Sequence, residues 1–223
     1  MKKSGKRGNF MVHSKKLEET ALWQVYQVKA ASDKKRSDWV KDVYEAAANY
    51  MKDVRLTFQN YTLHDETHIL NVMDAMGGLL GNKIEQLTVG EIELLILAAS
   101  LHDLGMVYTE EEREQSCRDE ETCRRFLREY APELLGSPAA EWPENMREWY
   151  LRTLHPYRLY EVLQNKGWKE LFDRRPLEVV PKPCMIAVCQ AHGEAPEELL
   201  LKEDLKYLAA NDAEPLFCAL LFC

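Results

Sequence analysis

A chain of 223 residues that is 46% hydrophobic and 30% charged can bury one sizeable core, which excludes the fibrous and disordered classes. Ten Gly and nine Pro are few for an architecture of strands and turns, so the composition disfavours an all-β fold. Residues 1–36 hold ten Lys/Arg against three Asp/Glu, which leaves 19 against 34 elsewhere and about −15 on the rest of the chain. This charge disfavours general binding to nucleic acid or to an anionic membrane.

The chain has no recognisable targeting or membrane segment. No stretch approaches the roughly 20 apolar residues of a transmembrane helix, and no apolar run follows the first ten residues. We therefore expect a cytoplasmic protein whose six cysteines are reduced, since their spacing is not that of a zinc knuckle. Residues 1–14 are expected to be a disordered basic tail, and residues 15–223 one domain that is truncated at its C-terminal end.

Helical periodicity dominates the chain and predicts a single all-α domain of about nine or ten helices. Apolar residues recur at helical intervals over 16–31 and over 39–58. A third helix is predicted from Asp65, which can cap it, to the Gly77-Gly78 pair or slightly beyond.

The fourth predicted helix, Glu91 to Leu104, opens with a capping box at Thr88 and ends at Gly105. Its interior, Leu94 to Leu101, is apolar on every side except for Ser100, so we expect the helix to be buried centrally. A second capping box, at Thr109, predicts a charged helix to about Tyr130. Further helices are expected over 142–154, 157–166, 183–191, 196–208 and 214–223.

Five of the six histidines lie at the ends of predicted helices or on helices rich in apolar residues: His64, His68, His102, His155 and His192. His102 precedes Asp103 at the carboxyl end of the buried helix, where an unpaired carboxylate would be costly without hydrogen bonds or a cation. Adjacent helical positions diverge by about 100°, so this pair can straddle one ion while Asp103 bridges to a second. A helical bundle can bring such side chains into one interior site.

The segments "YTLHDETHILNV", "AASLHDLGMV", "LHPYRLYEVL" and "VCQAHGE" resemble the HD-domain superfamily of metal-dependent phosphohydrolases, from about Tyr61 to the C-terminus. The resemblance implies that His68, His102 and Asp103 are metal ligands, that Asp103 is the bridge, and that His155 and His192 hold a second ion. This is the pattern of the subgroup with extra histidines, which binds two divalent transition metals. Iron, manganese or cobalt would suit these ligands.

The sequence departs from the superfamily in two places. Met106 stands where the "HD-Ile-Gly-Lys" run of the cyclic-dinucleotide phosphodiesterases has its lysine. The last metal ligand of the superfamily is an aspartate in a late helix, and the apolar run "LFCALLFC" that ends at Cys223 contains none. We expect this aspartate to follow Cys223 in a longer protein, or else to be lacking.

The resemblance implies hydrolysis of a phosphomonoester or phosphodiester, that of a nucleotide above all, with metals that activate water and neutralise phosphoryl oxygens. Asp103 would be catalytic through its bridging role. His64, four residues before His68, would contact the phosphate or protonate the leaving group. Arg152 and Arg158 flank His155 and are candidate phosphate contacts.

Three other functions fit the same residues. The domain could be a catalytically weak regulatory module that binds a nucleotide or metal for a fused C-terminal partner. It could be an oxygenase with a di-iron pair, or a helical interaction module in which the histidines are structural. The partners that we expect are a small phosphate ester or nucleotide, and neither a membrane nor a nucleic acid.

Overall fold

The structure is a computed structural model that describes residues 15–58, 66–116 and 120–193. The predicted tail over 1–14 and the predicted helices over 196–208 and 214–223 lie outside these residues. Every element of regular structure within the described residues is an α-helix or a 3-10 turn. The predicted all-α fold is confirmed.

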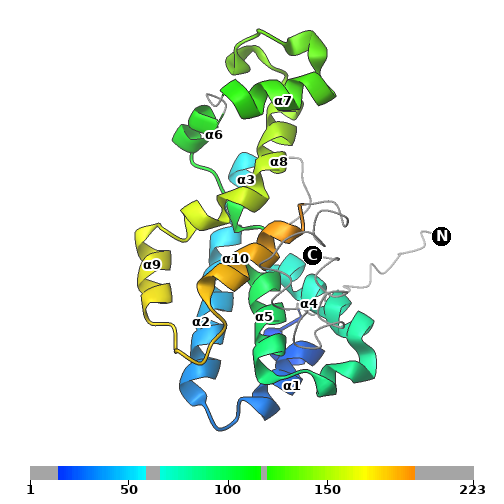
Figure 1. The fold of residues 1–223 in the computed structure, drawn as a ribbon, viewed down its shortest axis with the longest axis vertical. Helices are drawn as coiled ribbons and strands as arrows, with labels where there is room; N and C mark the ends of the chain where they lie inside the picture. Colours follow the sequence, from blue (N-terminus) through cyan, green and yellow to red (C-terminus); the bar gives the residue numbers. More distant parts are fainter. Residues whose placement is uncertain (1–14, 59–65, 117–119, 194–223) are drawn as a thin grey trace, which may run out of the picture.

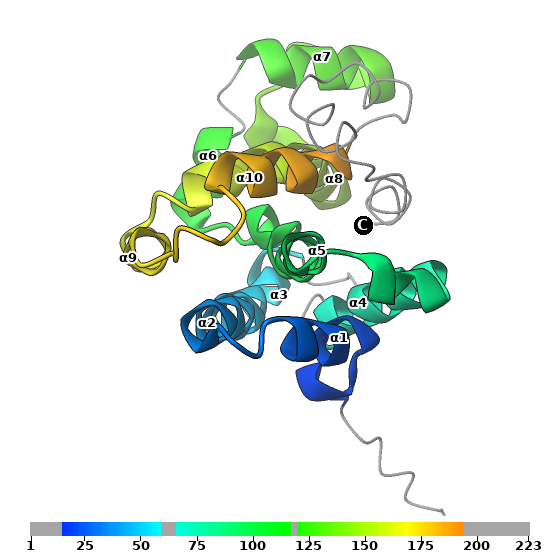
Figure 2. The same cartoon turned by 60° about the horizontal axis from the view of Figure 1, so that its bottom comes forward.

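A buried helix, α5 (Val89–Leu101), lies at the centre of the fold. Every residue from Ile92 to Leu101 is buried, as its apolar sequence predicts. The predicted capping box fixes its start, since the Glu91 N–H donates to Thr88 Oγ1 at 3.2 Å and the Thr88 N–H donates to Glu91 Oε2 at 2.6 Å. Figure 2 shows α1 (Ala21–Lys29), α2 (Lys34–Met51) and α4 (Glu66–Leu80) on one side of α5, and α8 (Glu144–Val162) and α10 (Lys182–Ala191) on the other.

A second, smaller hydrophobic cluster lies at one end of the molecule, where α6 (Glu110–Ser116) and α7 (Glu120–Tyr130) meet the beginning of α8 (Figure 1). We call residues 110–116 and 120–151 the distal lobe. Its buried members are Phe126, Leu127, Ala131, Trp142 and Tyr150. Helix α8 begins in the distal lobe and continues into the main core, so one rigid element belongs to both.

Several predicted helix boundaries were wrong. Helix α8 is continuous through Pro156, although the sequence predicts separate helices on either side of it. The predicted helix over 39–58 starts earlier and is divided into α2 and α3 (Val54–Thr57). Within the helix predicted from Thr109 to Tyr130, the described residues form α6 and α7. Helix α9 (Lys166–Asp173) was not predicted, and the indole N–H of Trp39 anchors it by donating to the Leu171 carbonyl at 2.9 Å.

No single helix in the described ranges has both the length and the apolar composition of a membrane span. The segments Val89–Met106 and Glu110–Ser116 have this length and apolar composition only when taken together, and they are bent by 80° relative to each other. The apolar character of the first segment has another explanation here, because α5 is covered by other helices.

A buried carboxylate ties four parts of the main core together. Glu93 on α5 accepts hydrogen bonds from the Arg36 guanidinium of α2 and from the Tyr26 hydroxyl of α1, the latter at 3.2 Å. Its other oxygen accepts the Val180 N–H, just before α10, at 3.0 Å. Burial, together with Glu93, raises the pKa of Tyr26, which therefore remains a hydroxyl donor at neutral pH.

Replacing Glu93 with Ala should lower the free energy of unfolding by about 3–5 kcal/mol, because the Arg36 charge and two other donors lose a buried acceptor. Urea unfolding followed by circular dichroism measures the change. Glu161→Ala, at an exposed position on α8, is the matched control and should stay within about 0.5 kcal/mol. Equal stability of the two variants would contradict the role given to Glu93.

Candidate metal centre

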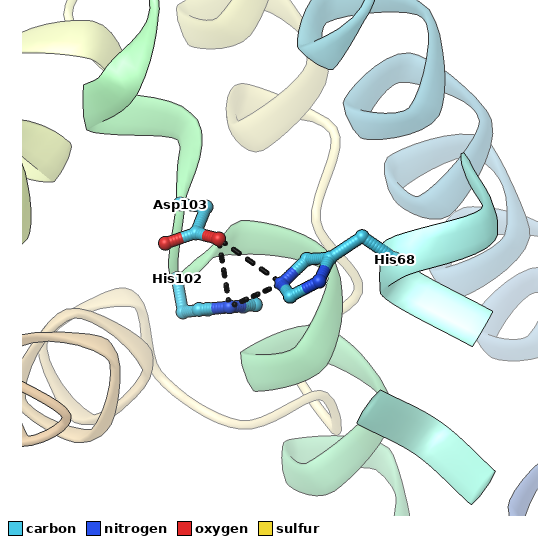
Figure 3. A group of neighbouring side chains, drawn as sticks. All are labelled: His68, His102 and Asp103. Carbon is cyan, nitrogen blue, oxygen red and sulfur yellow. Dashed lines mark hydrogen bonds and ion pairs between the residues drawn. The ribbon is translucent and has the colours of Figure 1, made fainter. Parts of the chain in front are cut away.

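Four helices deliver five predicted ligands to one place. His68 lies in the first turn of α4, His102 and Asp103 directly follow α5, His155 lies within α8, and His192 directly follows α10. The apolar faces that pack these helices around α5 therefore also determine where the polar side chains meet. Figure 3 shows three of these residues, with the His68 ring pointing from α4 toward the pair at the end of α5.

The two oxygens of Asp103 face different pairs of imidazoles. Asp103 Oδ2 lies 3.1 Å from His68 Nε2 and 3.1 Å from His102 Nε2. Asp103 Oδ1 lies 3.1 Å from His155 Nε2 and 3.7 Å from His192 Nε2. The residues thus form two groups of three potential ligands that share one carboxylate, which is the arrangement expected for a bridging aspartate.

Main-chain carbonyls set the orientation of three of the imidazoles. The Nδ1 atoms of His102, His155 and His192 lie at hydrogen-bonding distance from the carbonyls of Ala99, Arg152 and Cys189, each three residues earlier. A carbonyl only accepts, so each Nδ1 carries a proton, and each Nε2 presents a lone pair to the centre when its imidazole is neutral. Metal-binding histidines are commonly held in this way.

Each of these carbonyls lacks the usual helical partner, which is the N–H four residues later in the same helix. Ala99 and Cys189 lie in the last turns of α5 and α10, where no later N–H of the same helix donates to the carbonyls. Arg152 lies in the middle of α8, but the residue four positions later is Pro156, which has no N–H to donate. Pro156 therefore releases the carbonyl that orients His155.

The electrostatics of the site favour cations at both groups. His155 Nε2 and His192 Nε2 are 2.7 Å apart, and with both Nδ1 atoms protonated two lone pairs face each other beside a carboxylate oxygen. His68 Nε2 and His102 Nε2 are 3.3 Å apart next to the other oxygen. A contact between two unprotonated Nε2 atoms is repulsive unless a proton or a metal ion lies between them. The residues present therefore fit a metal ion in each group.

Interactions within the site shift the pKa values of Asp103 and His102. Burial is the largest influence on Asp103 and acts to raise its pKa, but His102, with His155 and His68, holds that pKa well below its ordinary value. Burial also acts to lower the pKa of His102, yet the Asp103 charge outweighs it and the pKa is raised. Asp103 is accordingly a carboxylate throughout the neutral range, as a bridging ligand must be.

Two glycines allow the chain next to the ligands to touch α8. A Cβ on Gly105, two residues after Asp103, would lie 2.0 Å from the His155 carbonyl oxygen. A Cβ on Gly193, directly after His192, would lie 2.6 Å from Pro156 Cγ. Both segments therefore pack against the same turn of α8, and this close packing sets the separation of the ligands.

Arg158 holds the turn that follows Asp103. Its buried guanidinium donates to the carbonyls of Gly105 at 2.6 Å and Val107 at 3.0 Å, and it stacks 3.6 Å from the centre of the Tyr108 ring. A further nitrogen lies 3.2 Å from Glu112 Oε1. In this structure the side chain positions the loop that carries Asp103.

The structure does not test the roles predicted for Arg152, Arg158 and His64. Arg152 is exposed, and its contact with the centre is through its main-chain carbonyl. Phosphate binding by Arg152 or Arg158 remains a prediction. His64 lies outside the described residues, so its catalytic role also remains a prediction.

Sequence reasoning missed the residues that act through the backbone. Pro156 was taken as a point between two helices, and Gly105 as a helix end. A signal was present for Pro156, because a proline after a histidine on an apolar helix implies a free carbonyl beside that imidazole. For Gly105 and Gly193 the reason lies in contacts with a helix distant in the sequence.

Gly105→Ala should lower the free energy of unfolding by about 1–3 kcal/mol and weaken metal binding, since the added Cβ must displace α8 at His155. Gly78→Ala is the control: its Cβ would meet nothing within 4 Å in α4, and it should stabilise by about 0.5–1 kcal/mol. Thermal melting and divalent-metal titration measure both effects. A Gly105 variant as stable as Gly78→Ala would refute the close packing.

The metal-free protein should lose stability as the pH falls from about 6.5 to about 4. Burial, aided by His102 and His155, lowers the pKa of His192 to about 4, whereas an unfolded chain has an ordinary histidine pKa of about 6.5. The unfolded state alone binds this proton between those values, so protonation favours unfolding. The pKa of His102 is raised, so the protonation of His102 changes the unfolding free energy at pH values above that range.

Urea unfolding of chelator-treated protein at several pH values tests this dependence. His192→Gln removes the titrating group, so its unfolding free energy should fall less steeply with decreasing pH than that of the wild type. Parallel curves for the two proteins would show that His192 does not carry the effect.

Comparison with known proteins assigns the family. Searches of curated proteins and of solved structures give no significant match. A protein-family model described as HD-CE matches residues 58–223, which cover most of the chain and all five residues of the metal centre. The chain therefore belongs to the HD-CE family, an HD-type family, and its His/Asp cluster is compatible with the HD motif.

Proposed function

We propose that this protein is a metal-dependent phosphohydrolase that cleaves a phosphomonoester or phosphodiester, in particular one of a nucleotide, at a dinuclear centre. One observation carries the proposal: the two oxygens of Asp103 each face a separate pair of imidazole Nε2 atoms. Membership of an HD-type family supports the same chemistry.

The ligand residues divide into two sets around the shared carboxylate. His68 and His102 would hold one ion with Asp103, and His155 and His192 would hold the other. Bound divalent ions of the iron, manganese or cobalt type supply Lewis acidity, by which they lower the pKa of a water and offset the charge on phosphoryl oxygens. The carbonyl hydrogen bonds keep the three imidazoles in the tautomer that this binding requires.

The candidate ligands differ in exposure, and this difference indicates the side from which a substrate would reach the centre. His68 is the most exposed of the five, with 30% of its side chain accessible against 9% for Asp103. The other three imidazoles are more buried, with 4% of the His102 side chain, 10% of His155 and 9% of His192 exposed. A substrate would therefore approach past His68, while the buried side excludes water and strengthens electrostatic interactions with the phosphoryl group. In this proposal His64, four residues before His68, donates the proton to the leaving group.

The metal-loaded protein should hydrolyse a nitrophenyl phosphate monoester or diester, and Asp103→Asn should lower the rate by more than about 100-fold because both groups lose their shared anion. Elemental mass spectrometry on untagged protein should find about two transition-metal ions per chain in the wild type. Asp173→Asn, at the exposed last residue of α9, is the control and should keep both metal and activity.

Other outcomes distinguish the alternatives. Two bound ions without phosphate release from any ester or nucleotide would favour a regulatory module. Oxygen consumption by the iron-loaded protein without phosphate release would identify an oxygenase. Absence of metal, with a melting temperature that a chelator leaves unchanged, would indicate a structural histidine cluster.

A further inference from the structure

The distal lobe contains a cleft that the metal centre does not use. Its volume is about 880 Å³, and residues of α6, α7, α8 and the 3-10 turn Ala139–Glu141 line it. This volume lies within the range of about 300–1,000 Å³ that is usual for small-molecule sites. The cleft is therefore large enough for a metabolite or a nucleotide fragment.

Positive charge converges on this cleft from three helices. Arg113 comes from α6, Arg124 from α7 and Arg147 from α8, whereas only Glu110 and Glu114 supply lining carboxylates. The lining thus carries a net positive charge on a chain whose net charge is −8. An arginine guanidinium offers a planar set of donors that matches carboxylate and phosphate oxygens.

Among the described residues, one nitrogen of these guanidinium groups lacks an acceptor. Arg113 and Arg147 both bind the one carboxylate of Glu144, Arg113 at 2.6 Å. The Glu144 side chain is half exposed. The other partner of Arg113 is Glu110, which lies 3.4 Å from it and has 78% of its side chain exposed. Within the described residues, Arg147 Nε is a buried side-chain nitrogen without a hydrogen-bond partner. An unmet buried donor is costly, and a bound oxyanion would supply the acceptor.

We propose that the distal-lobe cleft is an oxyanion-binding site for a small molecule that carries a phosphate or carboxylate group. The site is separate from the metal centre but lies on the same helix. Arg147, Leu151 and His155 follow one another at intervals of four residues on α8, so they share one face. Arg147 and His155 are about 12 Å apart along the helix axis.

Calorimetric titration of chelator-treated protein with inorganic pyrophosphate, and separately with citrate, tests the site without phosphate binding at metals. Arg124→Ala and Arg147→Ala should each weaken binding by about 10- to 100-fold through loss of a charge-assisted hydrogen bond. Arg125→Ala is the matched control, because Arg125 is exposed on α7 next to Arg124 and does not line the cleft. Its affinity should equal that of the wild type.

A second measurement needs no arginine variant. Cys123 is partly buried in the cleft wall, and Cys184 is partly buried on α10. Pyrophosphate or citrate should slow alkylation of Cys123, as followed by peptide mass spectrometry, and leave Cys184 unchanged.

Preference for pyrophosphate would identify a phosphate-bearing ligand, and preference for citrate a carboxylate. Absence of binding by the wild type would overturn the proposal, and so would affinities that the Arg124 and Arg147 variants share with Arg125→Ala. Equal rates of Cys123 alkylation with and without the anions would overturn it as well.

Discussion

The fold around the metal centre depends on one buried carboxylate. Asp103 lies at the end of the central buried helix, and an isolated carboxylate there would strongly oppose folding. Four imidazoles from four helices surround it, and each must arrive with a nitrogen directed at one of two oxygens. The helices are therefore constrained to one another by the need to satisfy this group as well as by their apolar contacts.

The main chain carries much of the precision of the centre. Three imidazoles are oriented by carbonyls that helix ends or a proline leave free, so their directions follow from the backbone and do not require a bound ion. Gly105 and Gly193 then bring the segments that follow two of the helices into contact with α8. A ligand set that is preorganised in this way loses little conformational entropy when it binds metal.

The resemblance to the HD-domain superfamily predicted the five candidate ligand positions, and the His102-Asp103 pair also carries a local signal. His102 and Asp103 end an apolar run that only a central helix can accommodate, and a capping box marks where that run begins. The sequence did not reveal the continuity of α8 through Pro156, because the compensating hydrogen bond comes from the neighbouring side chain. It also did not reveal α9, whose amphipathic pattern is short and whose anchor is Trp39, far away in the chain.

The close imidazole pairs join residues that are 34 and 37 positions apart in the sequence. No segment of the chain can assemble a complete donor group by local folding, because each group draws on at least two helices that meet only in the finished core. Closing such loops costs entropy before any contact repays it. A metal ion held by either group would therefore stabilise the completed core over any partly folded state.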